Sequence, residues 1–107
     1  MIKVVIERRL KEGARIFNLL REGRAAAMKH PGYITGETLL DTEDTSHILV
    51  ISSWQSLRDW DDFRKSEVRV NIDKRLEPFL TGPPEFHTYR YLSYEQAIRE
   101  TQQTGEK

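Results

Sequence analysis

Four segments of the chain have the apolar pattern of β-strands. In the first segment Ile2, Val4 and Ile6 stand at every second position, and β-branched side chains prevail there. The last segment alternates in the same way, with His87 and Tyr89 on one side of the strand. The pattern predicts strands over residues 2–9, 33–40, 47–54 and 85–92.

A helical period follows the first strand. Beyond Gly13, the apolar residues Ile16, Leu20 and Ala27 recur at multiples of three or four residues and align along one side of an amphipathic helix. We expect this helix to end before Pro31, because a residue that precedes proline disfavours helical geometry.

A second helical region follows the third strand. Ser56 precedes Asp59 by three residues, which is the spacing of a helix amino-terminal cap, and Ser66 can cap a second helical piece in the same way. The apolar stripe predicted for this second piece consists of Val68, Ile72, Leu76 and Phe79.

The order of the predicted elements is β-α-β-β-α-β. The polar run 41–46 is a turn that joins the second and third strands as a hairpin. Because crossover connections are right-handed, this order predicts a ferredoxin-like α+β fold, in which both helices cover one face of a four-stranded antiparallel sheet.

The third strand indicates what the uncovered sheet face does. Its run from Ile48 to Ile51 is apolar on both sides, whereas a sheet with one covered face needs apolar residues on one side only. A large exposed apolar patch usually marks an interface. We therefore expect a homodimer that packs sheet against sheet. A ligand cavity is the other explanation for a strand that is apolar on both sides.

The chain has the length of one domain, which we assign to residues 1–92, followed by a tail over 93–107. Within the tail, Tyr94 and Ile98 are four residues apart and allow a short helix. Two alternatives stay open at this point: the tail is solvated, or its helical part packs across the partner subunit.

Composition excludes several classes of function. The 17 basic residues balance the 17 acidic ones, so no net field favours nucleic acid or anionic membranes. The chain has no cysteine, which excludes disulfides, thiolate catalysis and zinc–thiolate sites. It also has no segment long and apolar enough to span a membrane and no signal peptide, so we expect a cytoplasmic protein.

Three stretches resemble a known family. Residues 2–9, the glycine-rich entry 30–39 to the second strand, and the Trp54-Gln55-Ser56 turn at the end of 49–56 are similar to the antibiotic biosynthesis monooxygenase domain, over roughly residues 1–92. The resemblance implies a dimeric α+β barrel. It also implies activities of that superfamily, which include cofactor-independent oxygenases of small aromatic compounds, quinol oxygenases and heme-degrading monooxygenases.

The heme-degrading branch is tested by three positions. That branch has an Asn at the end of the first strand, a Trp on the second helix and a His ligand ten residues beyond it. Aligned on the Trp54 turn, these positions hold Arg8, Phe63 and Asp73. Because a carboxylate is a poor replacement for an imidazole ligand of heme iron, heme degradation is not expected.

The resemblance and the strand phase together give candidate site residues. Trp54 and Trp60 resemble the paired aromatic positions of the cofactor-independent branch. Arg75 lies near the position at which proteins of that branch have an arginine. Arg8 shares the phase of the apolar residues in the first strand and points toward a pocket if the helices cover that side. The catalytic candidates are Trp54, Trp60 and Arg75, and the ligand-binding candidates are Arg8, His47 and Phe63.

Each candidate also has a structural explanation. Trp54 and Trp60 are equally suited to the core, and Arg75 to a solvated helix face. His47 is a general-base candidate because imidazole titrates near neutral pH, but it is also a typical strand-edge surface residue. His30, His47 and His87 have no metal-ligand spacing, so neither a metal nor another cofactor is expected.

Two functions follow from these observations. The first is a cofactor-independent monooxygenase that acts on a small aromatic or quinol substrate held between sheet and helices. The alternative is a non-catalytic dimeric domain of the same fold that binds a small ligand or has a structural role, and it is motivated by the absence of an evident acid–base pair.

Overall fold

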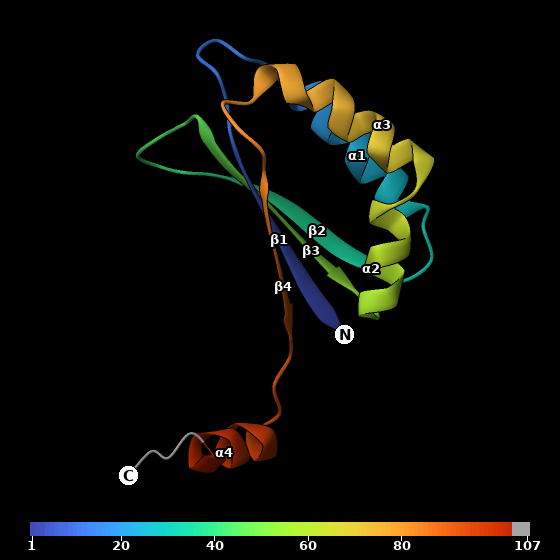
Figure 1. Ribbon diagram of the computed structural model, residues 1–107, viewed down its shortest axis with the longest axis vertical. Coiled ribbons are helices and arrows are strands. Elements are labelled where there is room, and N and C mark those ends of the chain that lie inside the picture. Colours follow the sequence, from blue (N-terminus) through green and yellow to red (C-terminus); the bar gives the residue numbers. More distant parts are fainter. Residues whose placement is uncertain (104–107) are drawn as a thin grey trace.

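The computed structural model describes residues 1–103 (Figure 1). The strands are β1 (Ile2–Arg9), β2 (Tyr33–Leu40), β3 (His47–Trp54) and β4 (Glu85–Arg90). The helices are α1 (Phe17–Met28), α2 (Leu57–Arg64), α3 (Glu67–Leu76), the short 3₁₀ helix η1 (Glu77–Phe79) and α4 (Tyr94–Gln103).

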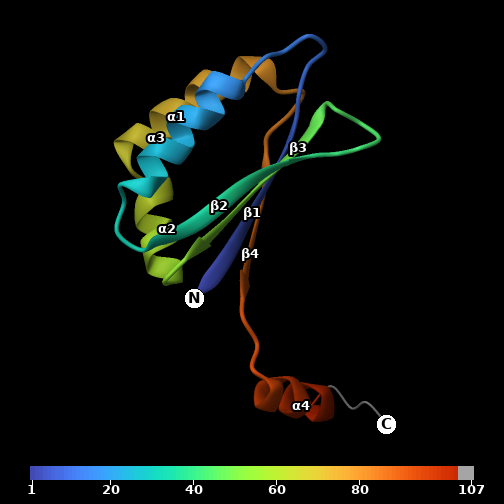
Figure 2. The same ribbon diagram turned by 180° about the vertical axis from the view of Figure 1, so that it is seen from behind.

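The sheet has the strand order β2-β3-β1-β4, and every neighbouring pair is antiparallel. Helices α1, α2 and α3 cover one of its faces, as both views show (Figures 1 and 2). The predicted ferredoxin-like α+β fold is therefore confirmed, including the hairpin between β2 and β3. We call the helix-covered face of the sheet the inner face and the opposite one the outer face.

The core lies between the inner face and the helices. Val4 and Ile6 of the central strand β1 are almost fully buried, as are Trp54 at the end of β3 and Trp60 and Phe63 of α2. Since successive residues of a strand point to opposite faces, the even-numbered residues of β1 are the ones that form this core. The predicted alternation thus fixes which side chains of β1 lie under the helices.

The second helical region begins as the capping residues predict. The Ser56 hydroxyl oxygen accepts a hydrogen bond from the Asp59 backbone N–H (3.1 Å), and the Ser66 hydroxyl oxygen accepts one from the Arg69 N–H (3.4 Å). Each bond satisfies one of the backbone donors that a helix leaves unpaired in its first turn. The two caps divide this region into α2 and α3.

The apolar stripe predicted for α3 was partly wrong. Val68 and Phe79 are 49% and 37% exposed, whereas Ile72 and Leu76 are buried together with Arg69. Arg69, Ile72 and Leu76 follow each other at three- and four-residue spacing and therefore share one side of the helix. The buried side of α3 thus contains a charged residue that the apolar pattern did not include.

Strand β4 is shorter than predicted, and a helix follows it. β4 ends at Arg90, and Tyr91 and Leu92 beyond it are exposed. Figure 1 shows α4 apart from the sheet and the other helices. The short helix that the sequence allows in the tail is present as α4, and the end of the predicted tail, residues 104–107, lies outside the described residues.

None of the described helices lies over the outer face of the sheet (Figures 1 and 2). Its central part contains the apolar side chains of Val5, Leu49 and Ile51, which are half-buried, and Leu39 and Tyr89, which are exposed. This is the apolar face from which the homodimer was predicted. None of the described helices is long and apolar enough to span a membrane.

We expect Gly32→Ala to destabilise the protein more than Gly13→Ala. Both glycines have positive φ (90° and 76°), which costs an L-residue roughly 1–2 kcal/mol. At Gly32 an added Cβ would also lie 2.5 Å from the Asp59 Cβ, whereas nothing lies within 4 Å at Gly13. Denaturant unfolding of both variants checks this, and equal losses would show that the contact with α2 adds no cost.

Candidate functional site

A cavity of about 60 Å³ lies between the inner face of the sheet and the helices. Strands β1, β2 and β3 form one wall, and α1, α2 and α3 form the other. Exposed Arg24, Glu37 and Thr38 line one end of it, so the cavity reaches solvent between α1 and the edge strand β2. We call this end the mouth of the cavity.

Aromatic rings form much of the cavity wall. The Trp54 ring is stacked on the Phe63 ring, with centroids 5.2 Å apart, and lies 5.7 Å from the Trp60 ring. Tyr33 contacts Trp54 edge-on at 5.4 Å. The Trp54 Nε1–H donates to the Ser52 hydroxyl (3.0 Å). A flat aromatic ligand would find matching surfaces in such a wall.

Two buried arginines lie at the end of the cavity away from the mouth. Arg8 is 4% exposed and comes from β1, and Arg69 is 7% exposed and comes from α3. The Arg69 guanidinium carbon lies 5.6 Å from the centroids of both the Trp60 and the Phe63 rings, which is a cation–π geometry. We call this end, with Arg8, Arg69 and Trp60, the inner end of the cavity.

One carboxylate serves both arginines. Asp73 Oδ1 accepts from Arg69 Nε at 2.9 Å and lies 4.0 Å from Arg8 Nη2. Asp73 is partly exposed, so solvent shares this carboxylate with the two guanidinium groups. Two positive groups therefore face one negative group. One positive charge at the inner end is left without a counter-charge from β1 or α3.

Three hydrogen-bond donors at the inner end have no partner among the described residues. They are Arg8 Nε, Arg69 Nη2 and Trp60 Nε1, and all three atoms are buried. A buried donor without an acceptor costs roughly 1–3 kcal/mol, so such groups are rare in native proteins and are concentrated where a ligand or water completes the bond.

Burial also acts on the charge of Arg8. Its pKa is lowered to about 10, first by removal of the guanidinium from water and then by the positive charge of Arg69, while Asp73 raises it. Arg8 therefore stays positive at neutral pH, but its charged form is held in an unfavourable environment. An anion at the inner end of the cavity would offset both effects by placing a negative charge beside the two guanidinium groups.

The structure brings four of the six candidate residues together. Trp54, Trp60, Phe63 and Arg8 all line the cavity, and their roles as catalytic or ligand-binding residues stay predictions. Arg75 does not line it: this arginine is on the exposed side of α3, where its two Nη atoms each donate to a carboxylate oxygen of Glu22 at 2.9 Å.

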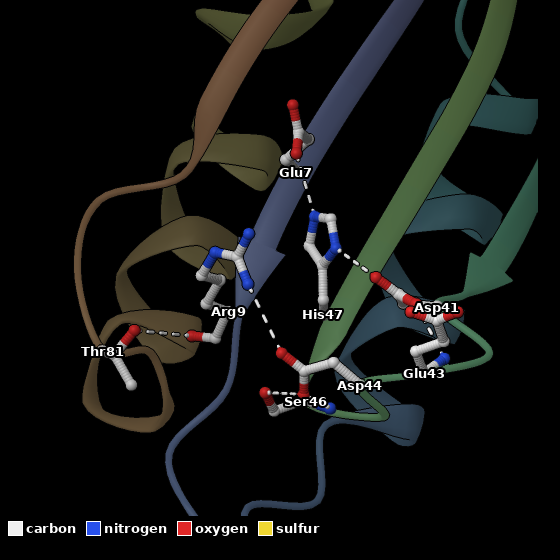
Figure 3. Close-up of polar contacts among 8 residues, drawn as sticks. All are labelled: Glu7, Arg9, Asp41, Glu43, Asp44, Ser46, His47 and Thr81. Atoms are coloured by element: carbon white, nitrogen blue, oxygen red, sulfur yellow. Dashed lines mark hydrogen bonds and ion pairs between the residues drawn. The ribbon is translucent and has the colours of Figure 1, made fainter.

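The sixth candidate, His47, points to the outer face (Figure 3). Its Nε2 lies 2.9 Å from Glu7 Oε1, and its Nδ1 lies 3.1 Å from Asp41 Oδ2. The two carboxylates raise the pKa of His47, with the Asp41 hydrogen bond as the largest cause. His47 is thus separated from the cavity by the thickness of the sheet.

The comparisons with known proteins agree with this architecture. The family model described as antibiotic biosynthesis monooxygenase matches residues 1–75. The chain belongs to the antibiotic biosynthesis monooxygenase family. No curated protein matches the chain.

Solved structures show the same fold at low sequence identity. SnoaB, a cofactor-independent oxygenase from Streptomyces nogalater, superposes with a TM-score of 0.74 and 13% identity, over 86% of this chain and 94% of SnoaB. A conserved protein from Methanosarcina mazei gives 0.77 and 21%, over 83% and 90%. A further antibiotic biosynthesis monooxygenase gives 0.79 and 17%, over 87% and 100%.

The residues of this family member do not fit a heme. Asp73 stands where the sequence alignment places the histidine ligand, and its carboxylate is bound to Arg69 and lies near Arg8, which stands at the asparagine position. The two replacements are thus one ion pair in space. Both contacts go to Asp73 Oδ1, and a carboxylate that is paired with arginine replaces an imidazole poorly as a ligand of heme iron.

On the outer face, Glu7 lies beside Glu85 and His87, which are close in sequence, and beside the distant His47. Glu7, Glu85 and His87 offer three possible metal-ligand atoms within 4.8 Å of one another, and His47 binds the same Glu7. Glu85 and His87 are exposed, and exposed acidic groups gather in many proteins without a metal. Antiparallel pairing of β1 with β3 and β4 creates this cluster.

Arg69 is the residue of this family member that sequence reasoning missed. The signal was present, because Arg69 precedes Ile72 and Leu76 by three and seven residues and Asp73 follows it by four. A charged residue in phase with an apolar stripe, with an opposite charge one turn away, indicates a buried ion pair. The predicted stripe took Val68 in its place.

The pH dependence of stability should change when His47 is replaced. The pKa of His47 in the folded state is raised above 6.5. Its contribution to the stability of the protein is therefore complete below that pH and is lost as the pH rises through the raised pKa. The pKa of Asp41 is lowered from 3.8, so the contribution of Asp41 to stability is lost as the pH falls through the lowered pKa.

The unfolding free energy of wild type should therefore fall between mildly acidic and mildly alkaline pH. In His47→Gln we expect this fall to be smaller. Denaturant unfolding across this range measures it. Asp41→Asn is the matched variant, in which an NMR titration should show the pKa of His47 closer to 6.5. An unchanged pKa in Asp41→Asn would contradict the assignment of the main cause.

Proposed function

We propose that the protein is a cofactor-independent monooxygenase that oxidises a small, electron-rich aromatic or quinol substrate in the cavity. The observation that carries the proposal is the combination of the aromatic wall, Trp54, Trp60 and Phe63, with the buried cation of Arg8 beside it. Membership of the family supports the reaction type. SnoaB is a cofactor-independent oxygenase with the same fold.

The reaction needs no reductant other than the substrate. An ionised phenol or quinol passes an electron to O₂, the two radicals combine at a ring carbon, and the resulting hydroperoxide loses water to leave a carbonyl. One oxygen atom of O₂ enters the product and the other leaves as water, so the four electrons that O₂ accepts come from the ring and its departing hydrogens.

The cavity can assist this chemistry by favouring the ionised substrate. A nearby guanidinium lowers the pKa of a bound hydroxyl group, and a water-poor apolar wall strengthens that effect. Among the described residues, no histidine lines the cavity, and Glu37, whose position in β2 pairs with Ile51 on the outer face, is the only acidic residue in its wall. We therefore assign the site to holding an anion rather than to removing a proton from a weakly acidic carbon.

The size of the cavity favours a small substrate. Its volume of about 60 Å³ is below the roughly 150 Å³ of a closed cavity that holds one benzene ring. The mouth between α1 and β2 gives room for part of a ligand outside the enclosed volume. A single ring therefore needs the mouth to hold part of it or some wall residues to move, and a polycyclic compound would need a larger displacement of the wall.

We expect metal-free protein to consume O₂ with single-ring quinols and dihydroxy aromatics, and expect ¹⁸O₂ to place one labelled atom in the product. Trp60→Ala should lose about tenfold or more of kcat/KM, because the aromatic wall positions the ring. The replacement also costs roughly 3–5 kcal/mol of stability. Activity is therefore compared below the unfolding temperature of the variant.

Arg58→Met is the control for this experiment. Arg58 is exposed on α2, the helix that carries Trp60, and does not line the cavity. O₂ uptake that survives Trp60→Ala, or that produces peroxide with no labelled product, would contradict the proposal. No uptake with any substrate of this class would favour the alternative function, a non-catalytic dimeric domain that binds a small ligand.

We also propose that the outer face forms a homodimer interface, sheet against sheet, in a cytoplasmic protein. The uncovered apolar side chains of Val5, Leu49 and Ile51 support it, since they form a continuous patch across β1 and β3. The exposed residues Tyr91, just before the tail, and Tyr94, near its start, are available for contacts with the same partner.

Ile51→Lys should convert the dimer into a monomer, because it places a charge in the middle of the apolar patch. Sedimentation should give wild type twice the 12.6 kDa mass of one chain, and the variant a single mass. Val70→Lys on the exposed side of α3 is the control and should stay dimeric. A monomeric wild type at micromolar concentration would contradict this interface.

A further inference from the structure

The inner end of the cavity combines buried positive charge with unused hydrogen-bond donors. Arg8, Arg69 and Trp60 line it and are 4%, 7% and 1% exposed. Each carries one buried nitrogen without an acceptor among the described residues: Nε, Nη2 and Nε1 respectively. Buried N–H groups are nearly always paired in native proteins, so three of them in one cavity indicate a missing acceptor.

The charge at this end points to an anionic acceptor. Asp73 provides one negative charge for two guanidinium groups. At the mouth Arg24 is exposed to solvent, and the Glu37 side chain has the phase of Ile51 on the outer face, so neither offsets the excess positive charge at the inner end. A neutral acceptor would satisfy the donors but not the charge.

A second opening beside Arg8 is a weaker candidate for the anion. Arg8 also lines a groove of about 410 Å³, which runs along Asp73, Thr81 and Pro83. In that groove Asp73 and Glu77 place two carboxylates against the single guanidinium of Arg8, so its lining disfavours an anion. Arg69 and Trp60, with their unpaired donors, line only the cavity of these two spaces.

We propose that the inner end of the cavity binds an anion with two adjacent oxygen atoms, a carboxylate or an ionised ortho-dihydroxy group, carried on a single aromatic ring. This rests on the proposed function because it names the substrate class of the same cavity. Guanidinium groups match such pairs of oxygens through parallel N–H donors, and the Trp60 indole supplies a further donor. Trp54 and Phe63 provide the surface for the ring.

Isothermal titration calorimetry with three one-ring compounds tests the proposal in mildly alkaline, chloride-free buffer. Benzoate carries the carboxylate, tropolone carries an ionised pair of adjacent oxygens, and benzamide is the neutral analogue of benzoate. At least one of the two anions should bind about tenfold or more tightly than benzamide, as expected for hydrogen bonds to a charged group. The stronger anion identifies which of the two groups the site prefers.

The proposal predicts that three variants change the affinity for anions in different directions. In Arg69→Met, Arg8 and Asp73 are left as one balanced pair, so anions and benzamide should bind equally. In Trp60→Phe, one donor is lost while the ring is kept, so anion affinity should fall a few-fold. In Asp73→Asn, the competing carboxylate is gone, so benzoate should bind more tightly and raise Tm more than in wild type. Arg58→Met should bind as wild type does.

Equal affinity of wild type for all three compounds would overturn the proposal, as would weaker anion binding by folded Asp73→Asn. Loss of binding through unfolding cannot imitate the gain expected for Asp73→Asn. The outcome is also separate from that of the oxygenase experiment. Anion preference without O₂ uptake would leave this site standing and remove the proposed reaction, whereas uptake of neutral substrates without anion preference would do the reverse.

Discussion

The structure depends on the central position of β1. This strand pairs with β3 on one side and β4 on the other, so each of its side chains must be accommodated above or below the sheet. Val4 and Ile6 satisfy the inner face as apolar core residues, but Arg8, in the same phase, brings a charge under the helices. Asp73 and Arg69 of α3 are arranged around that charge, so the sequence of one strand determines what the facing helix must supply.

Much of the fold follows from patterns that are local in sequence. Alternation located β1 and gave the phase of Arg8, and Ser56 and Ser66 marked the starts of α2 and α3. The site itself was only partly predictable. Arg69 was missed because an arginine on an apolar stripe is usually exposed, and its burial depends on Asp73 and on the rings of α2, which no local pattern places.

The histidines show the same limit for a different reason. His47 and His87 are 40 residues apart in the chain, and Glu7, which both contact, is 40 residues from the nearer of them. They gather around Glu7 because β1 lies between β3 and β4, which is a property of strand order. Glu7 and Arg8 are consecutive, yet they serve opposite faces. The sheet therefore separates a solvent-accessible acid–imidazole network from a buried cationic one.

The mouth of the cavity has a consequence for how such a protein can diversify. Its wall includes the edge strand β2, where Gly36 leaves space beside the Tyr33 hydroxyl, which lies 2.7 Å from the position of an added Cβ. Thr38 and Glu37 there are exposed, so replacing them disturbs little packing. The inner end is formed by Arg8 of β1, Arg69 of α3 and Trp60 of α2, where replacement of either arginine alters buried charge. Mutations at the mouth can therefore change the shape of the substrate that is accepted. The preference for a particular ligand charge depends on buried residues and changes less readily.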